Sequence, residues 1–371
     1  MGPAGVLRYG HPVVLCKESV MRRACVLLLC CLAVVSVRAA DIEEGKRIFG
    51  SVCASCHGPQ GKPDPDSPVV QALDPEPADL SDPLFNSREP RGDWVMVVEH
   101  GGHAMGLSEQ MPAQGENLTD GEIEAVVAYV KTLADTSEYP PGEMNLFLPV
   151  RTKKAFPEDE WVWKSRLENR DGEDVFRNVI EFEKRVGKAG QTIIEIIHAD
   201  DGVDSEFEEV EVGYKHAFAW SLENRSLWSA AFVVAVPLRS EGEVELAPYL
   251  AYAKQLNDAA IFQGSARVKL PVDDFDQGEL ELAGIVHYTW SPWPRRVFPA
   301  LELTATAPFD RNGEDAVQFT ALPQVRIGLT RGGHVALNLG VELPLSDQAY
   351  DTRYHLTLLW DFADGGFFKG W

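Results

Sequence analysis

Polar and apolar side chains alternate with a period of two along most of the C-terminal part of the chain. One stretch shows the pattern: Leu280, Leu282, Val286 and Tyr288 share one parity, whereas Glu279, Glu281 and His287 share the other. Successive side chains of a β-strand point to opposite faces of the sheet, so this period predicts amphipathic strands. The alternation predicts strands near 177–185, 189–198, 207–220, 227–238, 243–254, 259–270, 279–290, 297–307, 315–329, 334–345 and 352–362, with one more at 160–166.

The segments between these predicted strands carry Asp, Asn, Gly and Pro, as in Asp201-Gly202 and Gly332-Gly333. Connections of this kind join antiparallel neighbours. We therefore expect residues 161–371 to form an up-and-down antiparallel β-barrel of about 12 strands.

Two environments are compatible with such a barrel. Strands of about ten to twelve residues with one apolar face and aromatic residues near their ends are typical of outer-membrane barrels. The candidates for an interfacial aromatic girdle are Trp220, Trp228, Trp290, Trp293 and Trp360. A soluble β-sandwich or a lipocalin-like barrel with its apolar face inward has the same alternation, which does not show which face is wet. The number and length of the strands favour the membrane.

The N-terminal part contains the motif Cys53-Ala54-Ser55-Cys56-His57. In C-x-x-C-H, each thiol can form a thioether to one vinyl group of a porphyrin, and the histidine can bind the haem iron. The remaining cysteines, Cys16, Cys25, Cys30 and Cys31, all precede residue 40. Two cysteines with no further finger-like ligands argue against structural zinc, and the adjacent His57 favours haem over a disulfide.

Helical patterns flank this motif. Residues 41–52 read as an amphipathic helix, in which Gly45 leaves room for a second helix to cross closely. Asp93 is a plausible N-cap of a helix that ends at Gly101-Gly102. Thr119 and Glu122 have the spacing of a capping box, which opens a helix expected to run to about residue 134.

With this order of elements, residues 40–136 resemble a class I cytochrome c. The resemblance implies that Cys53 and Cys56 hold one haem c covalently and that His57 is its proximal ligand. It also implies that Met111, in the Met-Pro of the distal loop, is the sixth ligand. Met105 and His103 are the alternatives for that position. The family often uses a proline carbonyl to accept from the proximal histidine. Pro68 is the candidate here, and Pro59, Pro63 and Pro65 are the alternatives.

The start of the chain reads as a secretory signal peptide over residues 1–39. Residues 21–23 carry the positive charges of a signal peptide and residues 24–37 form its apolar region. Residues 1–20 do not follow this pattern, which suggests that the start codon is misassigned. The rest of the chain then carries 29 Lys and Arg against 56 Asp and Glu, a net charge of −27. This charge excludes nucleic acid as an expected partner and suits cationic ones.

As a whole, the chain resembles bacterial proteins that join a small cytochrome c to a porin-like barrel, with residues 137–160 as a linker. We expect a monohaem electron carrier, without catalytic activity of its own, at the periplasmic face of an outer-membrane barrel. Its expected partners are periplasmic redox proteins and outer-membrane lipid. Two alternatives remain: a porin or transporter plugged or redox-gated by its cytochrome domain, and a soluble periplasmic oxidoreductase subunit.

Overall fold

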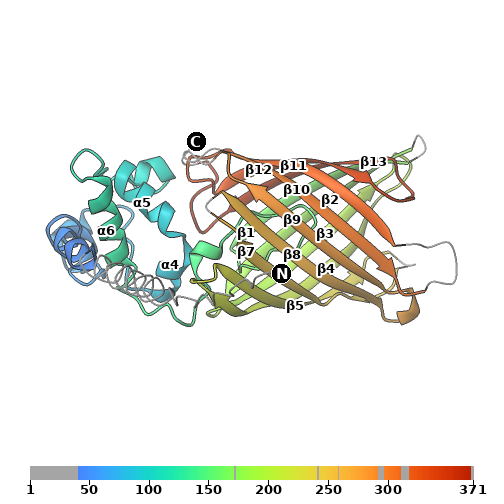
Figure 1. The fold of residues 1–371 in the computed structure, drawn as a ribbon, viewed down its shortest axis with the longest axis horizontal. Helices are drawn as coiled ribbons and strands as arrows, with labels where there is room; N and C mark the ends of the chain where they lie inside the picture. Colours follow the sequence, from blue (N-terminus) through green and yellow to red (C-terminus); the bar gives the residue numbers. More distant parts are fainter. Residues whose placement is uncertain are drawn as a thin grey trace, which may run out of the picture.

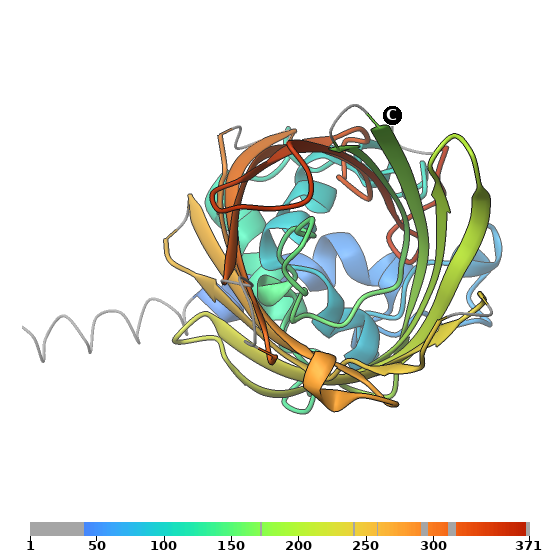
Figure 2. The ribbon, with the colours of Figure 1, turned by 90° about the vertical axis from the view of Figure 1, so that its right-hand side faces the viewer.

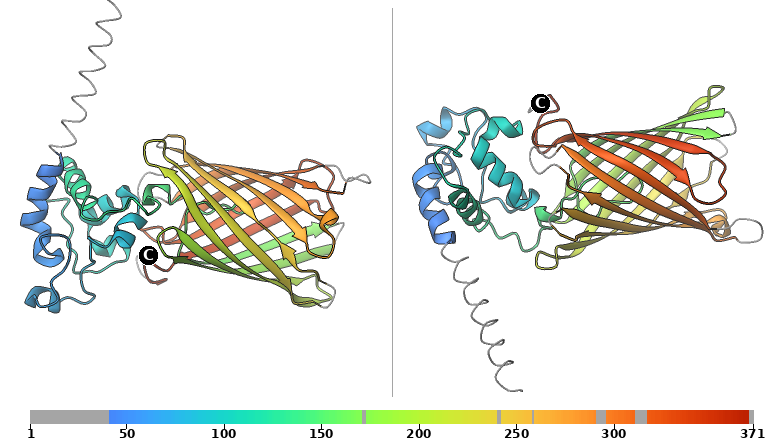
Figure 3. Two further views of the ribbon diagram at one scale, coloured as in Figure 1. Left: turned by 90° about the horizontal axis from the view of Figure 1, so that it is seen from below. Right: turned by 45° about the horizontal axis from the view of Figure 1, so that its top comes forward.

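The protein is described by a computed structural model that covers residues 41–170, 173–239, 242–257, 259–290, 296–310 and 317–368. The expected signal peptide at 1–39 and the girdle candidate Trp293 lie outside these residues. A small helical domain is followed by a closed β-barrel, and the helical domain lies beyond one open end of the barrel (Figures 1 and 3). The expected fold class is confirmed.

The barrel is a single antiparallel sheet in which strands pair with their neighbours in the sequence, except that β6 and β7 each pair with β5 and β8. Its strands are β1 (Glu160–Arg170), β2 (Glu173–Val186), β3 (Gly190–Asp200), β4 (Ser205–Ser221), β5 (Ser226–Pro237), β6 (Glu245–Leu246), β7 (Tyr249–Gln255), β8 (Ala260–Pro271), β9 (Glu279–Tyr288), β10 (Val297–Pro308), β11 (Gln318–Gly328), β12 (Val335–Pro344) and β13 (Thr352–Asp361).

The sheet closes because β13 pairs with β1, with Glu160 opposite Asp361. The short strands β6 and β7 share one place between β5 and β8, so the barrel has twelve positions around its circumference. An even number of positions returns both ends of the barrel to the same rim, which is the rim that faces the helical domain (Figure 1). We call this the haem-side rim, in anticipation of the site described below.

The two faces of the barrel are inverted relative to a soluble protein. The outward parity carries exposed large apolar side chains on nearly every strand, among them Trp163, Ile180, Ile194, Val212, Phe232, Leu250, Leu282, Leu303, Phe319, Leu339 and Tyr354. The inward parity carries buried polar and charged side chains, among them Glu181, Glu195, Lys215, Gln263, Glu281, Glu302, Asn338 and Glu342. An apolar face that points outward is the opposite of a lipocalin-like barrel.

The aromatic girdle differs in part from the expectation. Trp228 and Trp290 are exposed, as a girdle requires. Trp220 instead packs against a buried apolar cluster on the inside of the barrel. The reason is a β-bulge in β4 between Ala217 and Ala219, which reverses the face to which the following residues point. Trp360 is half-buried and donates from its indole nitrogen to the carbonyl of Gly365.

The helical domain begins with a helix over residues 41–48 that continues through the π-helical turn η1 (Phe49–Cys53) into α2 (Ala54–His57). The elements that follow are α3 (Pro68–Gln71), α4 (Pro83–Arg88), α5 (Arg91–His100), η2 (Gly102–Met105), α6 (Asp120–Val130) and η3 (Gly142–Met144). Among the described residues, no helix is long and apolar enough to cross a membrane.

Two helix boundaries differ from the sequence expectation, and one helix was not expected. Asp93 is not the N-cap of α5, because Pro90 holds that position and Asp93 lies in the first turn. The capping box of Thr119 and Glu122 is present, but α6 ends at Val130, before residue 134. Helix α4 was not expected, although Asp82 caps it and Pro83 opens it, a common start signal.

The first helix and α6 cross at Gly45. A side chain at this position would overlap the main-chain oxygen of Ala125 in α6. The rings of Phe49 and Tyr129 meet beside the crossing, with 5.4 Å between their centroids. The crossing buries Ile48, Phe49, Val126, Val127 and Val130 in one cluster, and the helix that carries the cysteines is thereby fixed to the domain core.

We predict that Gly45→Ala destabilises the helical domain by about 1–3 kcal/mol, the usual cost of an overpacked contact. The control is Gly121→Ala, because nothing lies within 4 Å of a side-chain carbon there. It should change stability by less than about 1 kcal/mol. Thermal unfolding of the full-length protein, followed by its helical circular dichroism, measures both. Equal midpoints for the two variants would contradict the close crossing.

Candidate functional site

Cys53, Cys56 and His57 lie within one helical stretch, from the last residue of η1 to the last residue of α2. Gly58 ends the helix with a φ of 72°, a left-handed conformation that favours glycine. The helix therefore stops directly after the histidine. Both cysteines are free and half-buried, so their thiols remain available for covalent attachment.

Burial of the turn shifts the pKa values of its side chains. Burial, with a contribution from Cys56, raises the pKa of the Cys53 thiol to about 11. Burial also lowers the pKa of His57, against the opposing effect of a main-chain hydrogen bond. The imidazole is therefore neutral at pH 7, which is the form that binds metals.

The hydrogen bond of His57 fixes which nitrogen remains for a ligand. Its Nδ1 lies 3.1 Å from the carbonyl oxygen of Ala78. Since that carbonyl can only accept, Nδ1 carries the proton and Nε2 presents a lone pair. The acceptor was expected at Pro68, and this expectation is wrong. Pro68 opens helix α3, whereas the irregular tract around Ala78 passes beside the histidine.

Asn86 holds that tract in place, and sequence reasoning did not identify it. Its side chain is fully buried, and its amide donates to the carbonyls of Leu80 (2.8 Å) and Val130 (2.9 Å). The tract that supplies the Ala78 carbonyl is thereby tied to the end of α6. The only signal in the sequence was the Asp82-Pro83 helix start, which places Asn86 in α4.

Met111 lies in a separate loop, which folds back on the end of α5. The amide of Gly102 donates to the Met111 carbonyl (3.0 Å), and the amide of Gln114 donates to Val98 (2.9 Å). A side chain at Gly102 would crowd the Met111 Cβ. The loop is thus fixed at its main chain, and the Met111 side chain is half-buried.

The alternatives to Met111 are engaged elsewhere or exposed. Met105 is only 8% exposed, and its Cε lies 3.4 Å from the place of a Cβ at Gly332, in a turn of the haem-side rim. Met105 therefore packs at the junction with the barrel. His103 is exposed, with its Nδ1 3.8 Å from the carboxylate of Glu109.

The helical domain meets the haem-side rim through a small number of polar contacts. Arg88, the last residue of α4, donates to the carbonyl of Ala363 (2.7 Å) and lies 3.5 Å from the carboxylate of Asp364. Glu138 forms an ion pair with Lys188 in the turn between β2 and β3. The cysteine-bearing helix lies on the side of the domain farthest from the barrel, shown in blue in Figure 1.

Comparison with known proteins identifies the helical domain. Residues 42–134 match the family model for cytochrome c. The sequence has no significant match among curated proteins. Among solved structures, the NanC porin aligns with 53% of this chain and 98% of its own, at 11% identity and a TM-score of 0.43. An outer membrane channel from Pseudomonas putida F1 aligns with 58% of this chain and 99% of its own, at 11% identity and a TM-score of 0.46.

The residues on the helical turn fit the haem that a cytochrome c domain implies. Two free thiols stand three residues apart, and the adjacent imidazole has its Nδ1 already hydrogen-bonded. Met111, in a loop fixed at its main chain, carries the thioether that stays the predicted second ligand. Nitrogen and sulfur donors of this kind are those that hold haem c iron.

We predict that Met111→Ala opens the sixth coordination position, so that the ferrous protein binds carbon monoxide. Met105→Ala is the matched control and should leave the six-coordinate spectrum unchanged, because its side chain packs at the barrel junction. Visible absorption of both purified holoproteins, with and without carbon monoxide, gives the comparison. A Met111→Ala protein that stays six-coordinate and excludes carbon monoxide would remove Met111 as the ligand.

Proposed function

We propose that this chain, whose residues 42–134 form a cytochrome c domain, is a one-electron carrier with a single haem c, anchored by its barrel in an outer membrane. One observation carries the proposal: the domain that carries the haem-attachment turn lies at the end of a barrel whose outer face is apolar. A cytochrome c domain does not need a barrel to carry electrons, and a barrel does not need a haem to insert into a membrane, so their presence in one chain suggests a membrane-anchored electron carrier.

The chemistry follows from the ligand set. The sequence has one C-x-x-C-H motif, at Cys53–His57, which supports a single haem. His57 and Met111 would hold the haem iron and leave no position open for oxygen or peroxide, and the bound group would supply outer-sphere transfer of one electron. The Ala78 carbonyl holds the proton on His57 Nδ1 and fixes the plane of the ring. The apolar cluster around Phe49 and Val127 keeps water from this side of the helix.

The outer face of the barrel supports insertion into lipid. Large apolar side chains are exposed on neighbouring strands. Because each is only about half exposed, moving it from water into an apolar phase gains on the order of 1 kcal/mol. A soluble chain rarely carries a patch of this size. The exported, outer-membrane location of a Gram-negative bacterium is the environment in which such barrels occur.

The orientation follows from the ends of the barrel. Both ends lie at the haem-side rim, whose turns at 187–189 and 222–225 are short. Connections at the opposite rim, such as 272–278 and 345–351, are longer. Outer-membrane barrels have short periplasmic turns and longer extracellular loops, so the cytochrome domain would face the periplasm.

The charge of the cytochrome domain suggests the kind of redox partner. Residues 41–136 carry 18 Asp and Glu against 6 Lys and Arg. A field of this sign steers positively charged partners and weakens with added salt. We therefore expect periplasmic electron-transfer proteins with a basic docking face, and a rate of electron exchange that falls as ionic strength rises.

We predict that Leu303→Arg impairs membrane insertion and Leu345→Arg does not. Leu303 is 51% exposed in the middle of β10, and Leu345 is 64% exposed just beyond the end of β12. An arginine at the bilayer midplane costs about 2–4 kcal/mol, and one near the interface costs at most about 1 kcal/mol. Denaturant unfolding in vesicles and heat-modifiable gel migration measure the difference. Full solubility of the unmodified protein without detergent would reject the membrane proposal.

The electron-transfer part has an independent test. A potentiometric titration of the holoprotein, followed by its visible absorption, should give one wave with the slope of a one-electron couple. The ferrous protein should not bind carbon monoxide. Two resolved waves, or a ferrous form that binds carbon monoxide readily, would contradict a single haem with both axial positions filled.

A further inference from the structure

The segment between the two domains lies inside the barrel. Residues 145–159, which we call the luminal plug, leave η3, enter the lumen from the haem-side rim and return to it before β1 begins at Glu160. Figure 2, viewed along the barrel, shows this segment as a green coil inside the ring of strands. The segment expected as a linker therefore occupies the space that a pore would need.

Side chains of the wall hydrogen-bond to the main chain of the luminal plug. The amides of Gln263 and Asn338 donate to the carbonyls of Phe147 (2.7 Å) and Leu148 (2.9 Å). The Lys215 ammonium donates to two further plug carbonyls, at 2.9 and 3.1 Å. The plug amides are paired as well, by donating to Ser265 Oγ, the Glu302 carboxylate and Gln191 Oε1.

These wall residues come from β3, β4, β8, β10 and β12, on opposite sides of the barrel. A chain segment in a water-filled channel would have water as its partner. Buried main-chain groups need hydrogen-bond partners. Because side chains from several strands supply them to this one irregular segment, the wall forms a specific binding site for it.

Ion pairs fix the middle of the luminal plug. The Arg151 guanidinium lies 2.5 Å from the Glu281 carboxylate and 3.2 Å from that of Glu342, and its main-chain amide donates to Glu302 (3.1 Å). Lys153 lies 3.4 Å from Glu195. Three carboxylates of the wall thus surround one residue of the plug, and all three are buried.

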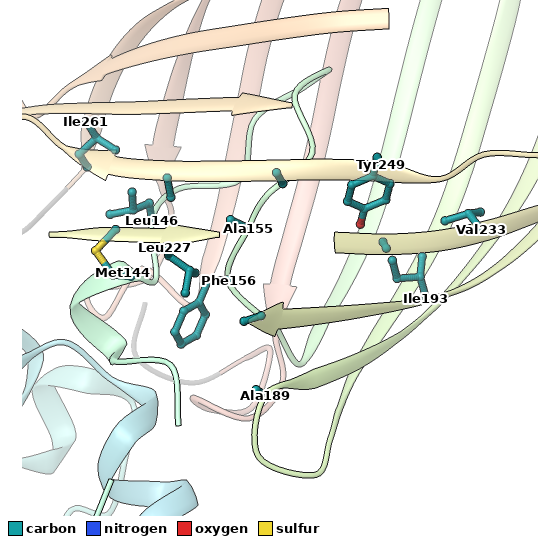
Figure 4. Close-up of a cluster of buried hydrophobic side chains, with 14 of the residues drawn as sticks. Met144, Leu146, Ala155, Phe156, Ala189, Ile193, Leu227, Val233, Tyr249 and Ile261 are labelled. Carbon is teal, nitrogen blue, oxygen red and sulfur yellow. The ribbon is translucent and has the colours of Figure 1, made fainter. Parts of the chain in front are cut away.

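The opposite side of the luminal plug packs on an apolar part of the wall. Leu146, Ala155 and Phe156 form one buried cluster with Met144 of η3 and with residues of β3, β4, β5, β7 and β8 (Figure 4). The inward positions here are small or apolar: Ala217, Leu227, Ala231, Val233, Ala251 and Ala253. Apolar inward side chains have no advantage in a wet channel, but they leave room for the plug.

The width of the barrel explains why such a segment is needed. Side chains alone fill a barrel of about 8 strands, whereas barrels of about 16–18 strands hold an aqueous channel. Twelve positions lie between these cases. We propose that residues 145–159 are a resident plug that closes the lumen to ions, and that their release uncovers a cation-selective channel lined by Glu281, Glu302 and Glu342.

The cation preference follows from the same contacts. Without Arg151, the Glu281 carboxylate loses this ion pair, whereas Glu342 keeps its contacts with Arg353 and His355. Carboxylates of a channel wall that lose a positive partner favour cations. Removing one partner of a buried ion pair shifts an equilibrium by about a hundredfold or more. The proposal goes beyond electron transfer, and its test does not use the haem potential.

The test is single-channel recording of the full-length holoprotein in planar bilayers. The unmodified protein should show no sustained openings. The double variant Arg151→Glu, Lys153→Glu should raise the open probability about a hundredfold or more. Its reversal potential in a salt gradient should move toward the cation equilibrium value. The control is the double variant Lys188→Glu, Lys254→Glu. It changes the net charge by the same amount, but at an exposed and a half-exposed position near the haem-side rim, outside the lumen.

Sustained openings of the unmodified protein, equal to those of the double variant, would overturn the proposal. A double variant that folds, as judged by heat-modifiable migration and an unchanged haem spectrum, but stays closed would also overturn it. If the membrane proposal fails, none of the proteins inserts, which is a different outcome.

A second variant covers the case in which the double variant does not fold. Thr152→Cys is a near-isosteric change at a position 3% exposed in the luminal plug, and Glu223→Cys is its exposed reference in a rim turn. A bulky, impermeant maleimide should modify the plug cysteine far more slowly in the folded holoprotein. Equal modification rates for the two cysteines would show that the plug is not held inside the lumen, and would overturn the proposal.

Discussion

Arg151 lies inside the barrel among Glu281, Glu302 and Glu342, and the relation between the two domains depends on this contact. A buried charge is stable only where it is paired, and removal of one partner is costly. The segment that leads out of the cytochrome domain is therefore held in the lumen along with its ion pairs. Contacts of Arg88 and Met105 then place the domain against the rim. A short connection held at one end by buried charges restricts where the haem turn can go.

The distribution of side chains on the barrel gives this arrangement its setting. Most exposed large apolar side chains of the strands point outward, and buried carboxylates such as Glu281, Glu302 and Glu342 point inward. Lipid is the environment that accepts the first group, and the luminal plug neutralises part of the second. In the proposed function, the barrel is the membrane anchor, and the side of the cytochrome domain that carries the attachment motif lies away from the barrel.

Much of this was predictable from local sequence. The period of two gave the strands to within a few residues, because each side of the sheet has one environment along its whole length. The C-x-x-C-H motif and Gly45 identified the turn and the helix crossing. Alternation cannot tell which face points outward, so the outward direction of the apolar face needed the pairing of the strands into a closed barrel. The luminal plug was missed because residues 145–159 have no period, and their partners, such as Glu342 for Arg151, lie far away in the sequence. The Ala78 carbonyl was missed for the same reason, because the sequence of an irregular segment does not predict which distant residues it contacts.

The central claim is that the haem is held at the end of a membrane-inserted barrel. Flotation of the reconstituted holoprotein after a carbonate wash tests it directly, with haem absorbance as the readout. We predict that the haem absorbance floats with the lipid vesicles, and that an impermeant reductant reduces the outward-facing haem. Haem that remains in the soluble fraction, with full-length protein intact, would contradict the account.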